Sequence, residues 1–365
     1  MLFKDCHVKG LLPLVRRGCA PLLGTVCFLF LISGLMPRTL SAAPLPPADH
    51  VIVLVMENKS LGEVAGNPVL PFFNSLPGTR FLNYWSVAHP SLPNYLALLG
   101  APPPLPGSDN PRIRVPGDSL PEEMVRHGMS VAAYMQGLPG DGYGGPSYPR
   151  VFSRYVEKHD PFLLFSRLRK GPERKNVHPL FRLKEALASD SLPAFSFVAP
   201  DLCHDMHGAF SCHMNRQELL RAGDRFLARW IPMIESSRSF HHSRCWIFIL
   251  WDESGSRSSW GGVPPPQIAP SPSRLHTGGR VALLWIDSKR PGQTMVSCFG
   301  NHYSLLETLT ENFRLPSLAP SGENVPLAGI GGGVSRQSGS RQRGLPLRII
   351  TSGRLCGHRW SGILR

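Results

Sequence analysis

The stretch Val51-Ile-Val-Leu-Val-Met-Glu57-Asn58-Lys-Ser60 joins a run of apolar residues directly to a carboxylate and an amide. A continuous aliphatic run with several β-branched residues is typical of a strand buried on both faces of a parallel sheet. In open α/β sheets the ligand crevice lies outside the carboxyl ends of the strands. The stretch therefore predicts a buried strand that delivers Glu57 and Asn58 to a binding site.

A second stretch has the same design. Cys245-Trp-Ile-Phe-Ile-Leu-Trp251 is apolar throughout and ends in Asp252 and Glu253. Carboxylate and amide oxygens are the ligands that hard cations prefer. Two strands that each end in such a pair predict one cation site built from Glu57, Asn58, Asp252 and Glu253.

Strand and helix patterns alternate along the chain, which predicts an α/β fold with a mostly parallel central sheet and helices on both faces. Long Pro- and Gly-rich connections separate the elements, consistent with 37 prolines and 36 glycines in 365 residues. The predicted strands are 51–56, 80–86, 130–135, 194–199, 245–251 and 280–286, and the predicted helices are 92–99, 119–127, 215–235 and 302–313.

The first 43 residues have the pattern of a signal peptide. Basic residues precede an apolar core at about 20–36, and Ser41-Ala42-Ala43 offers small residues for cleavage. A retained membrane anchor is the less favoured alternative, because the apolar core is short and contains Pro21 and two glycines. We therefore expect a secreted or periplasmic protein with its catalytic domain at 44–318.

Export would place the cysteines in an oxidising compartment. Cys203 and Cys212 are close enough in sequence to close a small loop as a disulfide, whereas Cys245 and Cys298 are expected to be buried free thiols. These expectations follow from the predicted export and from the position of each cysteine in the pattern.

The net charge of +14 comes mainly from the two ends of the chain. Residues 1–41 contribute +4 and residues 317–365 contribute +6, and no predicted helix of the central region stands out as strongly basic. Nucleic acid is therefore not an expected partner. The segment 319–365 is rich in Gly, Ser and Arg and is predicted to be a disordered tail.

His89-Pro-Ser91-Leu-Pro93-Asn94-Tyr follows a predicted strand and opens a predicted helix. Ser91 occupies the expected N-cap position, with Pro93 in the first turn. A plain helix cap is one interpretation. The other is a nucleophile at a helix N-terminus, where free N–H groups favour a phosphate and a metal could activate the hydroxyl.

Asp201-Leu-Cys-His204-Asp205-Met-His207 also follows an apolar strand. Two carboxylates and two imidazoles within seven residues are dense for a loop, which favours a functional site over a solvated turn. A further histidine, His302, begins the last predicted helix, but a lone histidine there is more often structural.

Together these segments resemble the phosphoesterase family that contains bacterial acid phosphatases and phospholipase C-type enzymes, within the alkaline phosphatase superfamily. The resemblance covers about residues 48–318 and rests on the order of several motifs. These motifs are Glu57-Asn-Lys-Ser60, His89 to Tyr95, Tyr155-Val-Glu-Lys-His159-Asp-Pro-Phe162, the segment 201–207, Trp251-Asp-Glu253 and Asn301-His-Tyr-Ser304.

The resemblance implies an alkaline phosphatase-like fold and a role for each site residue. Ser91 would be the nucleophile beside the metal, and a second group would line the opposite side of the phosphate as ligands or proton donors. The implied metal ligands are Glu57, Asn58, Asp252, Glu253 and Asp201, the further catalytic residues are Asp205, His207 and His302, and the substrate-binding residues are His89 and Asn94.

The expected function is that of an exported, metal-dependent phosphatase that hydrolyses a monoester through a phosphoseryl intermediate. The expected cofactor is a divalent cation, namely Ca²⁺, Mg²⁺, Mn²⁺ or Zn²⁺. One alternative is a phospholipase C-type diesterase with a mouth lined by Trp85, Trp260, Trp285 or the Tyr143 loop. The other is a non-catalytic relative that binds metal and phosphate.

Overall fold

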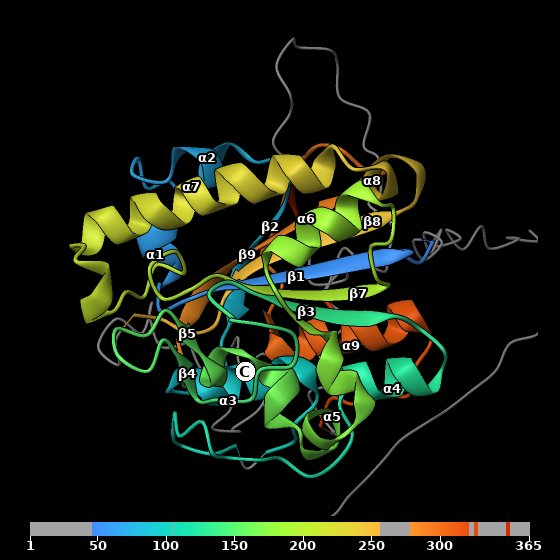
Figure 1. Cartoon of the computed structure of the whole chain (residues 1–365). Coiled ribbons are helices and arrows are strands. Elements are labelled where there is room, and N and C mark those ends of the chain that lie inside the picture. The colour runs from blue at the N-terminus through green and yellow to red at the C-terminus, as the bar shows by residue number, and fades with distance from the viewer. Residues whose placement is uncertain (1–45, 104, 256–277, 321–324, 328–347, 351–365) are drawn as a thin grey trace, which may run out of the picture. The chain divides into compact units, whose positions relative to one another are not determined.

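The computed structural model describes residues 46–103, 105–255, 278–320 and 325–327, together with the backbone of 348–350 (Figure 1). The predicted signal peptide at 1–43 lies outside these ranges, as do Trp260 and most of the tail at 319–365. Among the described helices, none has both the length and the apolar character needed to cross a bilayer.

The centre of the fold is one mixed sheet with the strand order β12-β10-β2-β9-β8-β1-β7-β3-β6, in which β11 also pairs with β2. Its strands are β1 (His50–Met56), β2 (Gly78–Trp85), β3 (Val131–Met135), β6 (Val177–Pro179), β7 (Phe195–Ala199), β8 (Cys245–Trp251), β9 (Arg280–Asp287), β10 (Gln293–Val296), β11 (Gly300–Asn301) and β12 (Arg348–Ile350). A separate two-stranded sheet joins β4 (Ser147–Tyr148) to β5 (Tyr155–Val156).

Helices cover both faces of the sheet (Figure 1). The group with α7 lies on one face and the group with α3 and α9 on the other. The first group comprises α2 (Pro71–Ser75), α6 (Phe181–Ala188), α7 (Arg216–Glu235) and α8 (Arg238–His242), and the second comprises α3 (Ser91–Leu99), α4 (Leu120–Arg126), α5 (Ser166–Lys170) and α9 (His302–Phe313). One turn of helix, α1 (Leu61–Val64), follows β1, and 3₁₀ turns occur at Glu157–His159, Pro161–Leu164, Pro172–Asn176 and Phe210–Cys212.

Every strand and helix predicted from the sequence is present, with ends within two residues of the predicted ones. The sheet is parallel at its centre, where β1 pairs with β7 and β8. The strand β9 is the exception, because it runs antiparallel to both β8 and β2. An antiparallel neighbour needs no crossover helix, which agrees with the absence of a predicted helix between 252 and 279.

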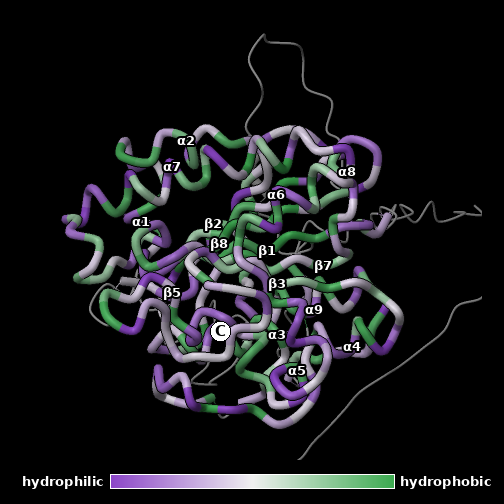
Figure 2. Tube along the Cα trace, in the orientation of Figure 1, coloured by the Kyte–Doolittle hydropathy of each residue, from purple (hydrophilic) through white to green (hydrophobic). Residues whose placement is uncertain are grey.

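The core follows from the apolar strands. All seven residues of β8 are buried, and in β1 only His50 is partly exposed. Figure 2 shows the hydrophobic residues concentrated along these central strands, while polar residues dominate the loops and the outer faces of the helices. Trp85 and Trp285 are buried as well. Neither lines a wide mouth of the kind that would favour a diesterase.

Two short pieces of the predicted tail belong to the fold. Leu327 is buried, and its backbone N–H donates to Thr308 Oγ1 at 2.8 Å. Arg348–Ile350 pairs in parallel with β10. Apart from residues 319–320 and 325–326, the rest of the predicted tail lies outside the described residues.

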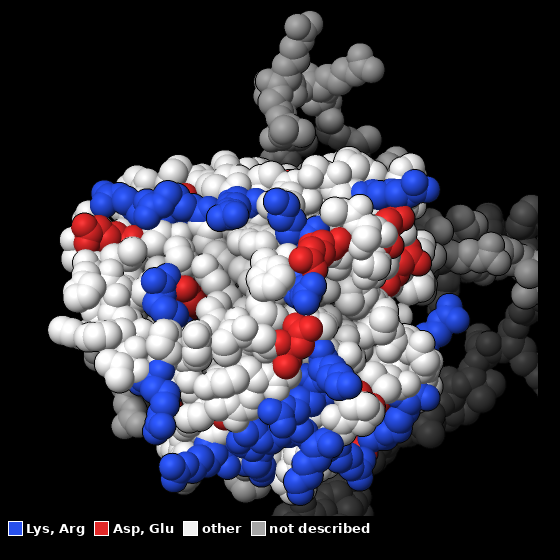
Figure 3. All heavy atoms as spheres, in the orientation of Figure 1, with Lys and Arg blue, Asp and Glu red and all other residues white. Residues whose placement is uncertain are grey.

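The surface charge is less uniform than the sequence suggested. Arg221, Arg225 and Arg229 follow one another at intervals of four residues, so they lie along the exposed side of α7. Figure 3 shows basic side chains along this helix and again near α5. The helix as a whole is not strongly basic, because its four arginines are opposed by Glu218, Asp224 and Glu235, but three of the arginines share one exposed side.

Candidate active site

The ends of β1 and β8 bring four oxygen-bearing side chains together. The two strands are parallel and pair Met56 with Trp251, so Glu57 and Asp252 follow at the same level. The Asp252 N–H donates to the Met56 carbonyl at 3.0 Å, and the Asn58 N–H donates to Asp252 Oδ1 at 2.8 Å. Glu57, Asp252 and Glu253 are all buried.

Ser91 lies in the middle of this group. Its hydroxyl is 3.0 Å from Glu57 Oε2 and 3.2 Å from Glu253 Oε1, so either carboxylate can accept its proton in a hydrogen bond. Asn58 Nδ2 donates to the Ser91 oxygen at 3.3 Å and to Glu57 Oε2 at 2.7 Å. Sequence motifs 30 residues apart or more thus converge on one hydroxyl.

The sequence predicted Ser91 as the N-cap of α3. In the structure Ser91 is instead the first residue of the helix. The N-cap is Pro90, which has no side-chain cap, and Asp109 Oδ1 accepts the Leu92 N–H at 3.0 Å instead. A carboxylate from a distant loop therefore takes over the capping role. The Ser91 hydroxyl is left to the buried carboxylates, which removes the interpretation of Ser91 as a plain helix cap.

The carboxylates differ in charge state. Burial alone would raise the pKa of Glu57, but the charges of His159 and Lys158 outweigh burial and lower the pKa to about 2. Burial and the charge of Glu57 raise the pKa of Asp252 well above its usual range, and burial also raises the pKa of Glu253. Glu57 is thus the most acidic group of the cluster, and its neighbours hold protons more readily.

His89 makes an ion pair with Glu253 through Nδ1. Because the carboxylate accepts, Nδ1 carries the hydrogen. Its Nε2 atom is buried and has no hydrogen-bond partner among the described residues. His89 was one of two residues predicted to bind substrate, and its Nε2 atom remains available for a hydrogen bond to the substrate.

Asn94, the other predicted substrate-binding residue, is committed to the backbone. Its Oδ1 accepts the N–H groups of Val87 and Ala88, and its Nδ2 donates to the carbonyls of Ala88 and Pro90. The side chain is fully buried. This geometry favours a positioning role, in which Asn94 fixes the loop that leads into Ser91.

His159 lies in the site, although the sequence pattern assigned it no role of its own. It is buried, with Nε2 3.1 Å from Glu57 Oε1 and Nδ1 3.7 Å from Asp205 Oδ2, and its ring stacks on Tyr95. Burial lowers the pKa of His159 to about 4, although the charge of Glu57 opposes this. The available signal was the motif around 155–162, in which His159 was one of several residues without an assigned role.

Lys158 and Lys59 were also missed. Lys158 Nζ donates to Asp109 Oδ2 at 2.6 Å, which links it to the residue that caps α3. Lys59 is buried and donates to the carbonyls of Asn58 and Met206. Both ammonium groups lie close enough to Glu57 to interact with it electrostatically. Lysine is usually exposed, so its type gave no signal of burial.

The segment 201–208 forms a tight loop beside β1. The Glu57 N–H donates to the Asp205 carbonyl at 2.8 Å, and Asp205 Oδ1 accepts the His207 N–H at 2.8 Å. Burial and the charge of Glu57 raise the pKa of Asp205 well above its usual range. His207 is exposed, and its Nδ1 donates to the Gly208 carbonyl. Asp205 thus lies beside Glu57, and His207 follows it at the surface.

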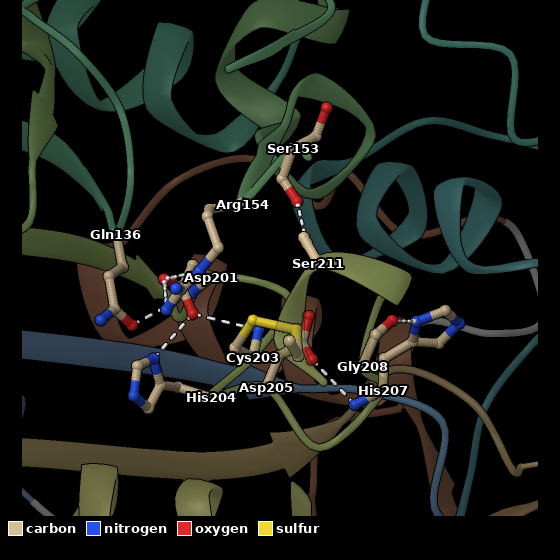
Figure 4. Close-up of a disulfide and its surroundings, with 11 residues drawn as sticks. Gln136, Ser153, Arg154, Asp201, Cys203, His204, Asp205, His207, Gly208 and Ser211 are labelled. Atoms are coloured by element: carbon tan, nitrogen blue, oxygen red, sulfur yellow. Dashed lines mark hydrogen bonds and ion pairs between the residues drawn. A yellow bond between two sulfur atoms is a disulfide. The ribbon is translucent and has the colours of Figure 1, made fainter. Parts of the chain in front are cut away.

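Asp201 organises this loop (Figure 4). Its Oδ2 accepts from Arg154 Nε at 2.9 Å, and its Oδ1 accepts from His204 and from the Cys203 N–H. Both oxygens are therefore engaged by protein groups. The structure gives Asp201 a loop-fixing role in place of the free carboxylate that a metal ligand requires.

The disulfide between Cys203 and Cys212 closes the loop, as predicted. Cys245 is buried and free, also as predicted. The prediction of a free thiol at Cys298 is wrong, because Cys298 is disulfide-bonded.

His302 supports the site from behind. It is fully buried, and its Nε2 donates to the Asp252 carbonyl at 2.7 Å. With the hydrogen on Nε2, Nδ1 accepts from the Tyr84 hydroxyl at 2.9 Å. Both ring nitrogens are occupied, so His302 positions Asp252 and has no proton to give to a substrate.

We expect His302 to make the stability of the protein depend on pH. Burial lowers its pKa from the usual 6.5 to about 4, so unfolding takes up a proton between these values. The contribution is complete above pH 6.5 and is lost as the pH falls towards 4, by roughly 3 kcal/mol. Urea unfolding of wild type and His302→Gln over this range should show a steeper loss for wild type. Parallel slopes would contradict the assignment.

The donor atoms of the cluster fit a divalent cation. Glu57 Oε1, Asp252 Oδ2 and Asp205 Oδ2 are buried and make no well-aligned hydrogen bond within the described residues, although the His159 ring lies 3.1 Å from Glu57 Oε1 and 3.7 Å from Asp205 Oδ2. Several carboxylates in one buried cluster need a compensating positive charge. The described part of the chain contains no set of three His, Cys, Asp or Glu side chains already gathered for metal binding. The fit therefore rests on carboxylates grouped around the Ser91 hydroxyl together with the Asn58 amide, whose Oδ1 must turn towards the cation.

Comparison with known proteins identifies the family of the chain. The model of the Phosphoesterase family matches residues 78–316. The phosphatidylinositol-3-phosphatase of Mycobacterium tuberculosis is 28% identical over 305 residues, which cover 82% of this chain and 88% of that protein. An acid phosphatase of Aspergillus fumigatus is 23% identical over 328 residues, covering 83% of this chain and 67% of its own.

The fold has solved counterparts. The crystal structure of a protein of the alkaline phosphatase superfamily from Vibrio parahaemolyticus superimposes with a TM-score of 0.51 at 14% identity, covering 79% of this chain and 72% of that one. This similarity confirms the predicted alkaline phosphatase-like α/β fold. Because the family model covers more than half of the sequence, the chain belongs to the Phosphoesterase family and is a phosphoric ester hydrolase.

Proposed function

We propose that the protein is an exported acid phosphatase-like monoesterase that works through a phosphoseryl intermediate and depends on a divalent cation. The observation that carries this proposal is the position of the Ser91 hydroxyl. It lies at the N-terminus of α3, within hydrogen-bond distance of Glu57 and Glu253. Asp109, not Ser91, accepts the Leu92 N–H and so caps the helix. Because Asp109 takes the Leu92 N–H and Pro93 has none, the backbone N–H of Ser91 is the donor of the first turn that an incoming phosphate could meet.

Activation of Ser91 begins with its proton. Glu57 and Glu253 both accept a hydrogen bond from the hydroxyl, so its proton can pass to either carboxylate. The ion pair with His89 holds the Glu253 carboxylate in place. Ser91 then attacks phosphorus in line with the leaving alcohol, and water later releases the phosphate from the serine.

The cation would be held by Glu57, Asn58, Asp252 and Glu253. When bound, it would polarise the phosphate and favour the ionised form of a neighbouring hydroxyl. Asp201 is not part of this proposed set, since Arg154 and His204 occupy its oxygens. The oxygen-rich donors favour Ca²⁺, Mg²⁺ or Mn²⁺ over ions that prefer nitrogen or sulfur.

The proton for the leaving alcohol would come from a residue of the loop 201–208. His207 is exposed, and its hydrogen bond to the Gly208 carbonyl fixes the ring through Nδ1. In its protonated form it can donate from Nε2. Asp205, whose pKa is raised by burial, holds the His207 backbone through Oδ1. We assign the general acid to His207, supported by Asp205.

Export is supported by the N-terminal pattern of residues 1–43 and by the disulfide between Cys203 and Cys212, since such bonds persist in oxidising compartments. The monoester assignment is supported by relatives named as a phosphatidylinositol-3-phosphatase and as acid phosphatases. The buried positions of Trp85 and Trp285 give no support to a wide diesterase mouth.

The proposal predicts metal-dependent hydrolysis of monoesters. We expect the purified protein to cleave a chromogenic phosphate monoester much faster than a chromogenic diester or phosphatidylcholine. Dialysis against a chelator should abolish the activity, and Mn²⁺ or Mg²⁺ should restore it. Full activity after chelation would contradict the cation requirement, and faster cleavage of the diester would favour the phospholipase C-type alternative.

A further inference from the structure

Exposed apolar side chains are concentrated at one place on the described surface. Tyr148 ends β4, Val151 and Phe152 lie in the loop after it, and Phe210 begins the 3₁₀ turn of a second loop; the exposed fraction reaches 61% for Phe152 and 84% for Phe210. Phe181, on α6, is exposed to 56% but stands apart from them. Grouped exposed apolar residues mark interaction sites, whereas a single one is ordinary.

The two loops contact each other and form one tip. The rings of Phe152 and Phe210 stack, with centroids 6.4 Å apart and an interplanar angle of 21°. The Ser211 hydroxyl donates to the Ser153 carbonyl at 3.0 Å, and the disulfide at Cys212 ties the second loop to the segment 201–208 (Figure 4). A tip that is already ordered loses little conformational entropy when it inserts into a partner.

The charge around this tip suits an anionic surface. Residues 146–154 and 208–217 contain no Asp or Glu. Arg150 lies inside the first loop and is exposed, with no ion pair among the described residues. Aromatic and aliphatic side chains that project beside a cation are typical of segments that enter the boundary between lipid headgroups and acyl chains.

We propose that this tip docks the protein on an anionic phospholipid surface, with Phe152 and Phe210 inserted into the interface. A second copy of the chain is the less suitable partner. The four exposed side chains offer on the order of 400 Å² of area, whereas a stable protein interface needs about 800 Å² from each partner. A few aromatic side chains are enough for interfacial binding to lipid.

The docking tip adjoins the site. The Leu202 N–H donates to the Arg154 carbonyl at 3.0 Å, which joins the segment between Phe152 and β5 to the loop that carries Asp205. Docking would therefore bring the site close to ester groups displayed on the surface. Binding itself requires no turnover, so the proposal goes beyond the proposed function and can be tested without it.

The test is co-sedimentation with vesicles that contain equal amounts of phosphatidylcholine and phosphatidylglycerol. Wild type should sediment with the vesicles, and the double variant Phe152→Ser/Phe210→Ser should partition roughly tenfold more weakly or worse, because two apolar side chains no longer leave water. The variant Val151→Asp, which keeps both rings and adds a negative charge, should show a similar loss. Phe181→Ser is the matched control and should bind like wild type.

Far-UV circular dichroism and urea unfolding show whether each variant is folded, and both should match wild type. Wild type that remains in the supernatant would overturn the proposal, as would a double variant that sediments normally. Sedimentation velocity without lipid checks the competing partner. A wild-type dimer that the double variant abolishes would assign the tip to self-association and would also overturn docking on lipid.

Discussion

Replacing Ser91 with alanine is expected to lower kcat for monoester hydrolysis by about 10⁴-fold or more, because the phosphoryl group then has no acceptor on the enzyme. The substitution should leave KM nearly unchanged if the helix N-terminus and the cation bind the phosphate. The free energy of unfolding should not fall, since the Ser91 hydroxyl caps nothing and sits among buried carboxylates. Steady-state kinetics and urea unfolding of the same preparation measure both effects.

Ser237 provides the matched control, because it is a buried serine that does cap a helix. Its hydroxyl accepts the Phe240 N–H at the start of α8. Ser237→Ala should lose about 1 kcal/mol of stability and keep its kcat. Ser91→Ala should show the opposite pattern. A Ser91→Ala protein that loses stability and retains most of its activity would return Ser91 to a structural role.

Replacing Glu57 with glutamine is expected to have the second largest effect. Glu57 is fully buried and accepts hydrogen bonds from Ser91 and Asn58, and its pKa of about 2 keeps it ionised. Glutamine fills the same volume without the charge, so kcat/KM should fall on the order of 10³-fold. Affinity for Mn²⁺, measured by titration calorimetry, should fall in parallel, which gives a readout that does not depend on activity.

Glu63 is the control for this change. It lies six residues further along, where it completes the capping box of α1 with Ser60 and pairs with Arg216. Glu63→Gln should bind Mn²⁺ like wild type and keep its activity. If Glu57→Gln retained wild-type affinity for Mn²⁺, the ends of β1 and β8 would not be the cation site.

The sequence was sufficient for the main elements because their hydrophobic patterns are strong. The fully apolar strands β1 and β8 admit one environment, a sheet covered on both faces, and the polar residues that end them must then meet at one edge. The amphipathic pattern of α7 and its capping box at Asn215 and Glu218 similarly fix where that helix begins. These features depend on residues close together in the sequence, so they could be predicted without a structure.

Other features were invisible because they depend on residues far apart in the chain. Asp109, in a Pro-rich loop, caps α3 and so frees Ser91, yet nothing in its local sequence marks it as a cap. His159 and Lys158 occur in a segment without a clear pattern, and only folding brings them beside Glu57. Conversely, Asn94 and His302 occur in motif positions, but their polar atoms are already bonded. Backbone groups occupy the Asn94 amide, and the Asp252 carbonyl and the Tyr84 hydroxyl occupy the two ring nitrogens of His302.

The sequence by itself determined the order of the elements, the burial of β1 and β8, and the presence of Glu57, Asn58, Asp252 and Glu253 at one edge of the sheet. These follow from periodicity and from the geometry of parallel strands. The tertiary structure alone decided which polar side chains keep a free atom. Hydrogen bonds to other parts of the protein occupy the polar atoms of Asp201, Asn94 and His302. The same packing places the buried Ser91 hydroxyl against the carboxylates that end the two strands.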